Sequence, residues 1–510
     1  MSSDSTSVFP LTLGTEREFA TARAFFSSAG FDEPGLCRLL GLADMSDLGK
    51  VEWEKCDKSK FSEALWACVE VFLRGNTYSD EALSKAWGAE PLQTFEALGL
   101  VRPSRKCAGS LFCPIWLYPM QGFLIASDRR TDPEAQLITT ADDVVFPGIY
   151  AGTLRFLRLL PDARGGEALD LCGGTGIGAL ILAKTARHAV TADLTARSAF
   201  FAEFNSRLSG VPVESLCGDL YAPVPHRLFD LITAHPPFVP SIGKTMIYRD
   251  AGDAGEDVSR GVIAGLAEHL RPGGTCMVLC VACDTTEAPF EQRAFAWLGE
   301  HRQEFEVLYG LEKIMTVEGV VSSMAKRGQN MSEEDAASLL HRLRSLQTKQ
   351  FVYGALFIRR LKTPTAPPPF RFRISPSATA REFERLFAWR RWCSGGGLEQ
   401  KIAQCKPTLR RDVELNVRHL VSEGELVPAE FVFSIDEGVR SAFRPSGWVV
   451  PLLAQLNGQR TVAEVFARFQ GAEELPKGFQ LSDFTSLVQQ MIEKGFFDLD
   501  LAGSSGDEHS

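Results

Sequence analysis

The spacing of apolar residues divides the chain into stretches of different character. From about residue 15 to 99 apolar side chains recur every three or four positions, as in Phe19, Ala22, Phe25 and Phe26, which is typical of amphipathic helices. Between 143 and 361 short apolar runs alternate with amphipathic segments, which predicts alternating strands and helices. From 431 to 501 two strand-like runs precede three amphipathic segments, which predicts a small α+β module.

The middle stretch carries the clearest pattern. The expected strands are 167–171, 189–193, 213–217, 228–234 and 275–281, and the expected helices between them are 178–187, 196–209 and 258–270. A later pair of runs, 305–309 and 351–360, is expected to supply two edge strands, with a helix over 333–347 between them. This order predicts the α/β fold class, with a parallel sheet covered by helices on both faces.

Breaks in the pattern divide the 510 residues into five expected parts. Residues 1–126 are expected to form a helical cap with the helix-helix-helix-hairpin order of a winged helix, and 127–362 form the α/β domain. Residues 363–430 are expected to be a Pro-rich linker and a basic helical segment. Residues 431–501 are expected to form a winged-helix-like module, and 502–510 a disordered tail.

Composition narrows the class of protein. Apolar residues make up 45% of the chain and charged residues 23%, and no apolar run approaches the length of a membrane helix, about 20 residues. Twelve scattered cysteines and a polar N-terminus favour a soluble cytoplasmic protein. The net charge of −10 makes nucleic acid an unlikely partner, although residues 371–418 are locally basic and leave that partner open.

A glycine-rich turn follows the first expected strand of the α/β domain. The turn, Cys172-Gly173-Gly174-Thr175-Gly176, lies between that strand and the start of a helix. Glycines let the backbone turn tightly and approach a ligand, and the positive end of the helix favours an anionic or nucleotide-like group. This loop alone is compatible with many ligands.

Three aspartates follow the ends of the first three strands. They are Asp170, Asp193 and Asp219. A carboxylate accepts two hydrogen bonds from a diol, so Asp193, which lies 23 residues after Asp170, fits a ribose-binding role. These aspartates do not separate a nicotinamide enzyme from a methyltransferase. The G-G-T-G-x-G spacing, however, differs from the dinucleotide pattern G-x-G-x-x-G.

The fourth strand is followed by His235-Pro236-Pro237-Phe238. Two prolines directly after a buried strand end its pairing and fix the preceding backbone. With the glycine loop and the aspartates, this motif resembles the class I S-adenosylmethionine-dependent methyltransferases. It is most similar to the HemK-type small-domain N-methyltransferases, whose signature is Asn-Pro-Pro-Tyr/Phe. Two later stretches, 248–257 (Tyr-Arg-Asp-Ala-Gly-Asp-Ala-Gly-Glu-Asp) and Arg-Pro-Gly-Gly at 271–274, also resemble segments of that group.

The resemblance implies a Rossmann-like seven-stranded methyltransferase sheet that binds S-adenosyl-L-methionine and requires no metal. It implies that the glycine loop and Asp170 line the methionine end of the cofactor, that Asp193 binds the ribose, and that Asp219 and Leu220 flank the adenine. Residues 235–238 would face the methyl acceptor. The expected cofactor-binding set is Asp170, Cys172, Gly173, Gly174, Thr175, Gly176, Asp193, Leu194, Asp219 and Leu220, and the expected catalytic set is His235, Pro236, Pro237 and Phe238.

His235 departs from the family pattern, which has Asn at this position. A neutral imidazole has one donor and one acceptor, and it can also take a proton. We therefore expect methyl transfer to a nitrogen of a protein, peptide or small molecule, with no membrane involvement. Transfer to a hydroxyl or to an RNA base is the alternative reaction. A cofactor-binding scaffold without catalysis is the alternative of another class.

Two further patterns need an interpretation. Cys276, Cys280 and Cys283 have the spacing of a radical-type iron–sulfur motif, but the apolar residues between them favour a buried strand. In the C-terminal module, Gly-Gln-Arg-Thr-Val-Ala-Glu-Val at 458–465 and Met-Ile-Glu-Lys-Gly-Phe-Phe at 491–497 resemble PqqD-like peptide-recognition winged helices. An ordinary winged-helix interaction module is the alternative interpretation.

Overall fold

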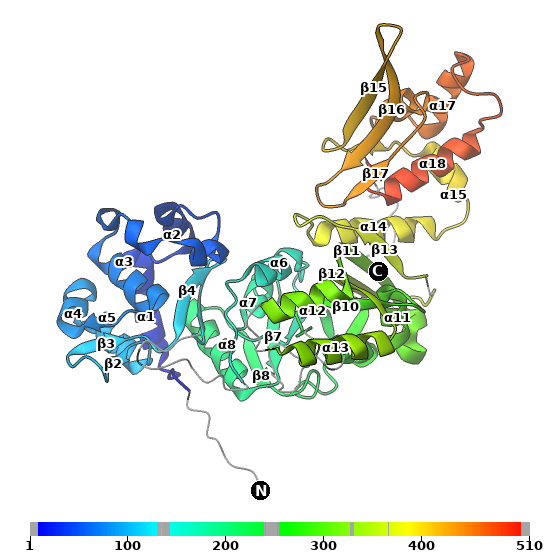
Figure 1. Ribbon diagram of the computed structural model, residues 1–510. Coiled ribbons are helices and arrows are strands. Elements are labelled where there is room, and N and C mark those ends of the chain that lie inside the picture. Colours follow the sequence, from blue (N-terminus) through cyan, green and yellow to red (C-terminus); the bar gives the residue numbers. More distant parts are fainter. Residues whose placement is uncertain are drawn as a thin grey trace. The chain divides into compact units, whose positions relative to one another are not determined.

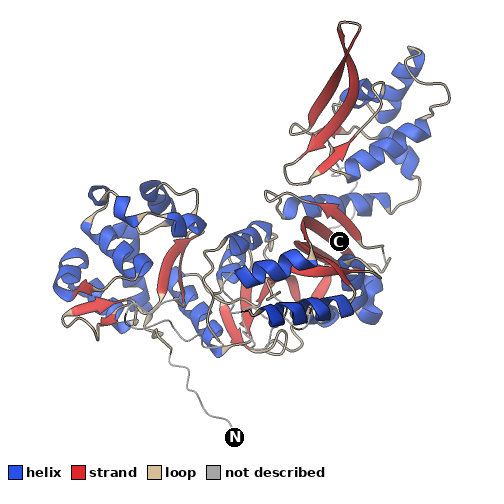
Figure 2. Cartoon of the chain, in the orientation of Figure 1, coloured by secondary structure: helices blue, strands red, loops and turns tan. Residues whose placement is uncertain are grey.

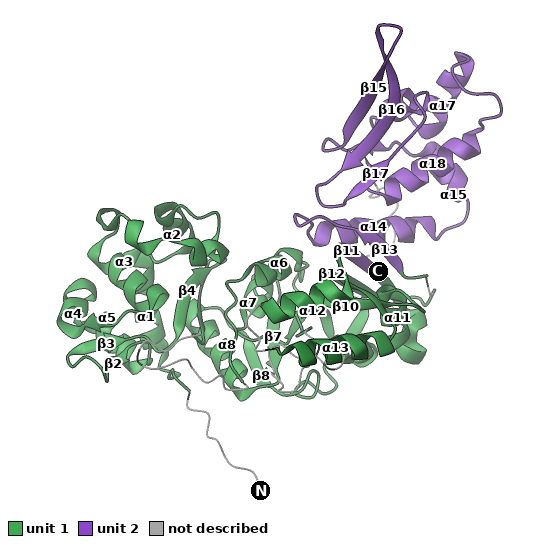
Figure 3. Cartoon of the chain, in the orientation of Figure 1, with its two compact units in different colours: residues 1–307, 313–369 green, residues 308–312, 370–510 purple. Residues whose placement is uncertain are grey.

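The structure is a computed structural model that describes residues 9–129, 134, 143–238, 240, 252, 254–326, 331–365 and 367–500 (Figure 1). The chain forms two compact units, one of residues 1–307 and 313–369 and the other of residues 308–312 and 370–510 (Figure 3). Within the described ranges, no helix combines the length and the apolar content that crossing a membrane requires. Figure 2 shows helices and strands interleaved along the chain.

The first unit begins with the expected helices, which pack around an aromatic core. Its helices are α1 (Glu16–Ala29), α2 (Glu33–Leu40), α3 (Glu63–Cys68), a π-helical turn (Val69–Arg74), α4 (Asp80–Trp87) and α5 (Ala89–Ala97). Phe26, Phe72 and Phe95 are buried, with ring centroids 5.1 to 5.8 Å apart. A small antiparallel sheet joins β1 (Tyr78–Ser79), β3 (Ser110–Phe112) and β2 (Arg102–Pro103), and a hairpin joins β4 (Trp116–Met120) and β5 (Phe123–Ser127).

The α/β part is organised around one large sheet. Its strands are β6 (Glu167–Leu171), β7 (His188–Asp193), β8 (Glu214–Cys217), β9 (Phe229–Ala234), β10 (Leu270–Thr285), β11 (Phe305–Met315) and β12 (Thr348–Arg360). They lie in the order β11-β12-β10-β9-β6-β7-β8. Strands β6 to β10 pair in parallel, and β12 pairs antiparallel to β10. The strands predicted from the sequence are therefore confirmed, as is the α/β fold class.

Helices connect the strands of this sheet. They are α6 (Ala151–Leu159), α7 (Ile177–Leu182), α8 (Ala196–Ser209), α9 (Asp257–Ala264), α10 (Leu266–His269), α11 (Phe290–Trp297), α12 (Val317–Lys326) and α13 (Glu333–Ser345). Strand β13 (Phe370–Arg373) pairs in parallel with residues 308–311 and adds an eighth strand. The expectation that 305–309 and 351–360 are edge strands is wrong, because β13 takes the outer position and β12 lies inside the sheet.

The second unit continues with α14 (Ala380–Cys393) and α15 (Leu398–Gln404). They are followed by β14 (Thr408–Leu409), β15 (Glu414–Ser422), β16 (Glu425–Ile435), β17 (Ser441–Phe443), α16 (Val449–Ala454), α17 (Val462–Gly471), α18 (Leu481–Glu493) and β18 (Phe497–Asp498). Trp389 and Ile402 belong to the same apolar core as Phe433, Phe466 and Phe484. The continuous part of this unit therefore begins at residue 370, whereas the sequence pattern places the start of the C-terminal module at 431.

Candidate functional site

The glycine loop between β6 and α7 adopts a conformation that only small residues tolerate well. Cys172, Gly174 and Gly176 have φ angles of 57°, 55° and 78° in the left-handed region. A Cβ atom at Gly173 would lie 1.9 Å from the Oγ1 atom of Thr191. The loop is therefore pressed against β7 on one side, while the position of a Cβ at Gly174 is open.

Asp170 lies beneath this loop. Its side chain is 2% exposed, and the Thr233 hydroxyl on β9 donates a hydrogen bond of 2.7 Å to its Oδ1 atom. A Cβ at Gly178 would lie 2.3 Å from its Oδ2 atom, so the carboxyl group fills the space below the start of α7. Burial raises the pKa of Asp170 to about 7. Asp170 thus connects the loop to the strand that leads to His235.

Asp193 ends β7 beside the loop. The Gly174 N–H donates to its Oδ2 atom at 2.9 Å, and the Thr195 N–H donates to its Oδ1 atom at 3.2 Å. Burial raises the pKa of Asp193, although these backbone donors act in the opposite direction. The Gly218 N–H donates to the Asp193 carbonyl at 2.9 Å, which brings the segment after β8 to the same edge of the sheet.

The predicted cofactor residues therefore come together. Burial, together with the charges of Asp193, Asp170 and Asp219, raises the pKa of the Cys172 thiol well above its ordinary value. The side chains of Asp219 and Leu194 are exposed at this edge, and Leu220 has a φ angle of 45°. The carboxyl ends of β6, β7 and β8 thus place Asp193 and Asp219 beside the glycine loop and Asp170 in the core beneath it.

His235 lies directly after β9 within a group of aromatic rings. Its ring stacks on Phe156 of α6, with centroids 5.2 Å apart and an interplanar angle of 16°, and it lies 6.3 Å from the ring of Phe238. Burial lowers the pKa of His235 to about 4, so the imidazole is neutral at neutral pH. Pro236 is buried and Pro237 is half-buried. Half of the predicted segment 248–257 lies outside the described residues.

Sequence reasoning missed a side chain that positions the loop. Asn205 of α8 is fully buried, and its amide group donates to the carbonyl oxygens of Thr175 (2.9 Å) and Ala126 (3.0 Å). Its Oδ1 atom accepts a hydrogen bond from the Ala126 N–H at 2.8 Å. Asn205 therefore ties the glycine loop to β5 of the cap. The sequence carries no local signal for it, because the partners of Asn205 lie far away along the chain.

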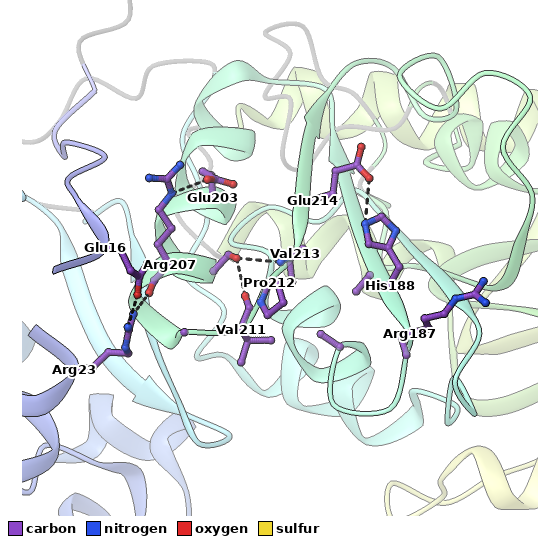
Figure 4. Close-up of a pocket in the computed structure, with 15 residues that line it drawn as sticks. Glu16, Arg23, Arg187, His188, Glu203, Arg207, Val211, Pro212, Val213 and Glu214 are labelled. Atoms are coloured by element: carbon purple, nitrogen blue, oxygen red, sulfur yellow. Dashed lines mark hydrogen bonds and ion pairs between the residues drawn. The ribbon is translucent and has the colours of Figure 1, made fainter. Parts of the chain in front are cut away.

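A hollow of about 610 Å³ lies beside the amino-terminal ends of β7 and β8 (Figure 4). His188 and Glu214, the first residues of β7 and β8, line it. Its charged groups are paired, since His188 lies 3.2 Å from Glu167 and 3.4 Å from Glu214, and Arg23 lies 2.6 Å from Glu16. It is therefore separate from the predicted cofactor residues, and its mixed charges indicate no particular ligand.

The three cysteines at 276, 280 and 283 lie in β10, between β9 and β12, and are at most 1% exposed. Burial raises the pKa of each thiol. The interpretation of this stretch as a buried strand is confirmed. No group of three or more potential metal ligands was found among the described residues.

Comparison with known proteins favours a methyltransferase over a nicotinamide enzyme, the two classes that the glycine loop and the aspartates left open. The model of one family, the methyltransferase small domain, matches residues 145–290. Residues 145–290 are therefore similar to the methyltransferase small domain. The match spans the glycine loop, the three aspartates and the His-Pro-Pro-Phe motif, and it confirms the predicted class I methyltransferase family and its S-adenosylmethionine cofactor. The left-handed loop and the adjacent carboxylates are compatible with that cofactor.

Curated relatives of the methyltransferase domain include two glutamine methyltransferases. The chain is 30% identical over 135 residues to the release factor glutamine methyltransferase of Geobacter sulfurreducens. This match covers 24% of this chain and 47% of that protein. It is 27% identical over 271 residues to the ribosomal protein uL3 glutamine methyltransferase of Bradyrhizobium diazoefficiens. That match covers 48% of this chain and 80% of that protein. The chain spans about half the length of the release factor enzymes that it matches.

Among solved structures, the 16S rRNA N2 G1207 methyltransferase of Thermus thermophilus is similar. The identity is 15%, the match covers 56% of this chain and 65% of that chain, and the TM-score is 0.27.

Proposed function

We propose that this protein transfers the methyl group of S-adenosylmethionine to a side-chain nitrogen of a protein. One observation carries the proposal. The glycine loop with Asp193 and the His-Pro-Pro-Phe motif lie at the carboxyl ends of β6, β7 and β9, which are neighbours in the sheet. A protein acceptor is supported by the relatives, whose names specify release factor and ribosomal protein uL3 as the proteins methylated.

The cofactor half of the proposed site uses the predicted residues. Asp193 accepts hydrogen bonds from the ribose hydroxyls, Asp219 and Leu220 flank the adenine, and the glycine loop faces the methionine part. Asp170 supports the glycine loop from beneath, because its carboxyl group is hydrogen-bonded to Thr233 and buried under α7. The full proposed set is Asp170, Cys172, Gly173, Gly174, Thr175, Gly176, Asp193, Leu194, Asp219 and Leu220.

The acceptor half centres on His235. Pro236 and Pro237 hold the backbone after β9, and Phe156 and Phe238 flank the imidazole. In the transfer the bond between sulfur and the methyl carbon breaks, a bond from the acceptor nitrogen to that carbon forms, and the nitrogen loses one proton. A neutral His235 accepts a hydrogen bond from the nitrogen and then its proton. Since the sulfonium methyl is already activated, proximity and orientation supply the remaining acceleration.

The experiment is incubation of the full chain with methyl-labelled S-adenosylmethionine and fractionated lysate. We expect label in protein, released as a methylated nitrogen side chain after hydrolysis, and its loss in Asp193→Ala. Label in RNA, or in small molecules only, would overturn the protein acceptor, and a methyl ester or ether would overturn the nitrogen. Binding of the cofactor without any transfer would favour the scaffold. His188→Ala, at the amino-terminal end of β7, is the matched control.

We further propose that the protein acts in the cytoplasm and that the second unit recruits the acceptor. Unpaired thiols support the first point, because none of the twelve cysteines forms a disulfide in the described chain. Deleting residues 370–510 is not a clean test of the second point, because β13 belongs to the large sheet. Photo-crosslinking from the second unit of the intact chain to a methylated acceptor tests it. Crosslinks confined to the first unit would contradict recruitment.

A further inference from the structure

The hairpin of β15 and β16 is the most exposed regular element of the second unit. Figure 1 shows its turn at the free end of a long ribbon. Each residue of β15 is exposed, as are residues 425–429 of β16. The outer half of the ribbon therefore pairs only with itself, and an isolated two-stranded ribbon is at most marginally stable in water. We call residues 418–428 the hairpin arm.

The hairpin arm is apolar on both faces. Leu420 lies opposite Val427, and the next pair is Val421 opposite Leu426. Successive pairs project to opposite faces of a ribbon, so each face carries one apolar pair. Val421 and Leu426 are 76% and 71% exposed. Of the twelve large apolar residues exposed in the described chain, six lie on this hairpin, which is a concentration that marks an interaction surface.

Charge is separated along the arm. Its turn carries Glu423 and Glu425, and neither forms an ion pair with a described residue. Lower down, Arg418 and Arg444 share one carboxylate, with Nε atoms 3.0 and 3.2 Å from Glu430. The tip is therefore negative, and the middle of the hairpin has a net positive charge.

The turn fixes the direction of the arm. Glu423 and Gly424 have φ angles of 52° and 86°, both in the left-handed region, as in the tight two-residue turns that match the twist of a hairpin. The apolar pairs and the glutamates are thus presented on a defined scaffold.

We propose that the hairpin arm is a dimerisation surface and that its occupant is the arm of a second copy of this chain. A two-fold axis near the Leu420–Val427 pair sets the two arms antiparallel and packs this apolar pair of one copy on the same pair of the other. The same axis brings Glu423 and Glu425 of each copy to the level of Arg418 and Arg444 of the other. Each contact then occurs twice, as an isologous interface requires.

The charge pattern selects this occupant. A uniformly basic partner would be repelled by the middle of the hairpin, and a uniformly acidic one by its tip. An anionic membrane is disfavoured by the two glutamates at the point of insertion. The partner must present positive charge to the tip of the arm and negative charge to the middle of the hairpin. An antiparallel copy of the arm presents its charges in that order.

Sedimentation of the full chain over a range of concentrations tests the proposal. We expect a concentration-dependent dimer, a monomer for Leu420→Asp/Val427→Asp, and an unchanged dimer for Leu346→Asp, an exposed apolar residue of the first unit. A wild-type chain that stays monomeric overturns the proposal. So does a dimer that survives the two arm substitutions, with circular dichroism showing that the variant is folded.

A charge swap tests the arrangement of the two arms. Glu423→Arg/Glu425→Arg should weaken the dimer about tenfold at low salt, since opposed rim charges become alike. Adding Arg418→Glu/Arg444→Glu to the same chain should restore it, because every cross-copy pair is again opposite in sign. A fourfold variant that dimerises no better than the twofold one contradicts the antiparallel arrangement. The outcome is independent of whether the chain transfers methyl groups.

Discussion

The two halves of the proposed site are held in different ways. The cofactor half is fixed by buried polar side chains from other elements. Thr233 donates a hydrogen bond to Asp170, Asn205 donates one to the Thr175 carbonyl, and Thr191 packs against Gly173. In the acceptor half, His235 is placed by the end of a strand, two prolines and aromatic neighbours, and no described group is hydrogen-bonded to its ring. The difference indicates that cofactor binding is built into the framework, whereas the choice of acceptor depends on few residues.

The largest effect is expected from removal of the imidazole. His235→Ala should lower the transfer rate by about 10²- to 10⁴-fold, the usual range for loss of a general base, and leave S-adenosylmethionine affinity within about twofold. Single-turnover transfer and calorimetric binding measured on the same variant separate the two effects. Transfer at the wild-type rate would show that His235 does not act on the acceptor.

The next effect should appear in the cofactor half alone. Gly173→Ala places a methyl group 1.9 Å from the Thr191 hydroxyl, and overpacking of this kind costs about 1–3 kcal/mol. Cofactor affinity should fall about 10- to 100-fold. Gly49→Ala, at a position with free space, is the control. The double variant Gly173→Ala/Thr191→Ala removes the clashing hydroxyl and should recover most of the affinity; failure to recover would refute the packing explanation.

A smaller effect is expected where the loop is tied to the cap. Asn205→Asp keeps the shape of the side chain but cannot donate to the carbonyl oxygens of Thr175 and Ala126. Leaving such groups unpaired costs about 1–3 kcal/mol, so the melting temperature should fall and cofactor affinity should drop about tenfold. The exposed Asn416→Asp is the matched control. An unchanged affinity in a folded Asn205→Asp protein would limit Asn205 to a structural role.

The smallest effect is expected in the pH dependence of stability, because Asp170 and His235 have pKa values shifted in opposite directions. The folded-state pKa of Asp170 is raised from 3.8 to about 7, so its contribution to stability is present below pH 3.8 and is lost as the pH rises through 7. The folded-state pKa of His235 is lowered from 6.5 to about 4, so its contribution is present above pH 6.5 and is lost as the pH falls through 4.

Substitution of each group should therefore change the pH dependence of unfolding in opposite directions. Between pH 4 and 6.5, Asp170→Asn should make the free energy of unfolding rise more steeply with pH than in wild type, and His235→Asn should make it rise less steeply. Denaturant titrations at several pH values measure both slopes. Equal slopes for both variants and wild type would contradict the assigned environments.

Much of the framework was predictable because its residues carry strong local signals. The strand at 167–171 was predicted to the residue, since an apolar run ends there at a glycine turn, and the order of the aspartates placed them at one edge of the sheet. The edge strands were predicted wrongly, because the four residues of β13 lie within a Pro-rich stretch. Asn205 and the outer part of the hairpin of β15 and β16 were missed. The burial of Asn205 depends on a tertiary contact, and the outer part of the hairpin has no buried face to produce an alternating pattern.

The central claim is that the glycine loop and Asp193 bind S-adenosylmethionine, and calorimetric titration of the full chain tests it most directly. We expect one saturable site per chain in wild type, with affinity reduced at least tenfold in Asp193→Asn, which keeps the size of the side chain but presents one fewer acceptor oxygen to the ribose diol. No binding to wild type, or equal affinity in Asp193→Asn, would contradict it.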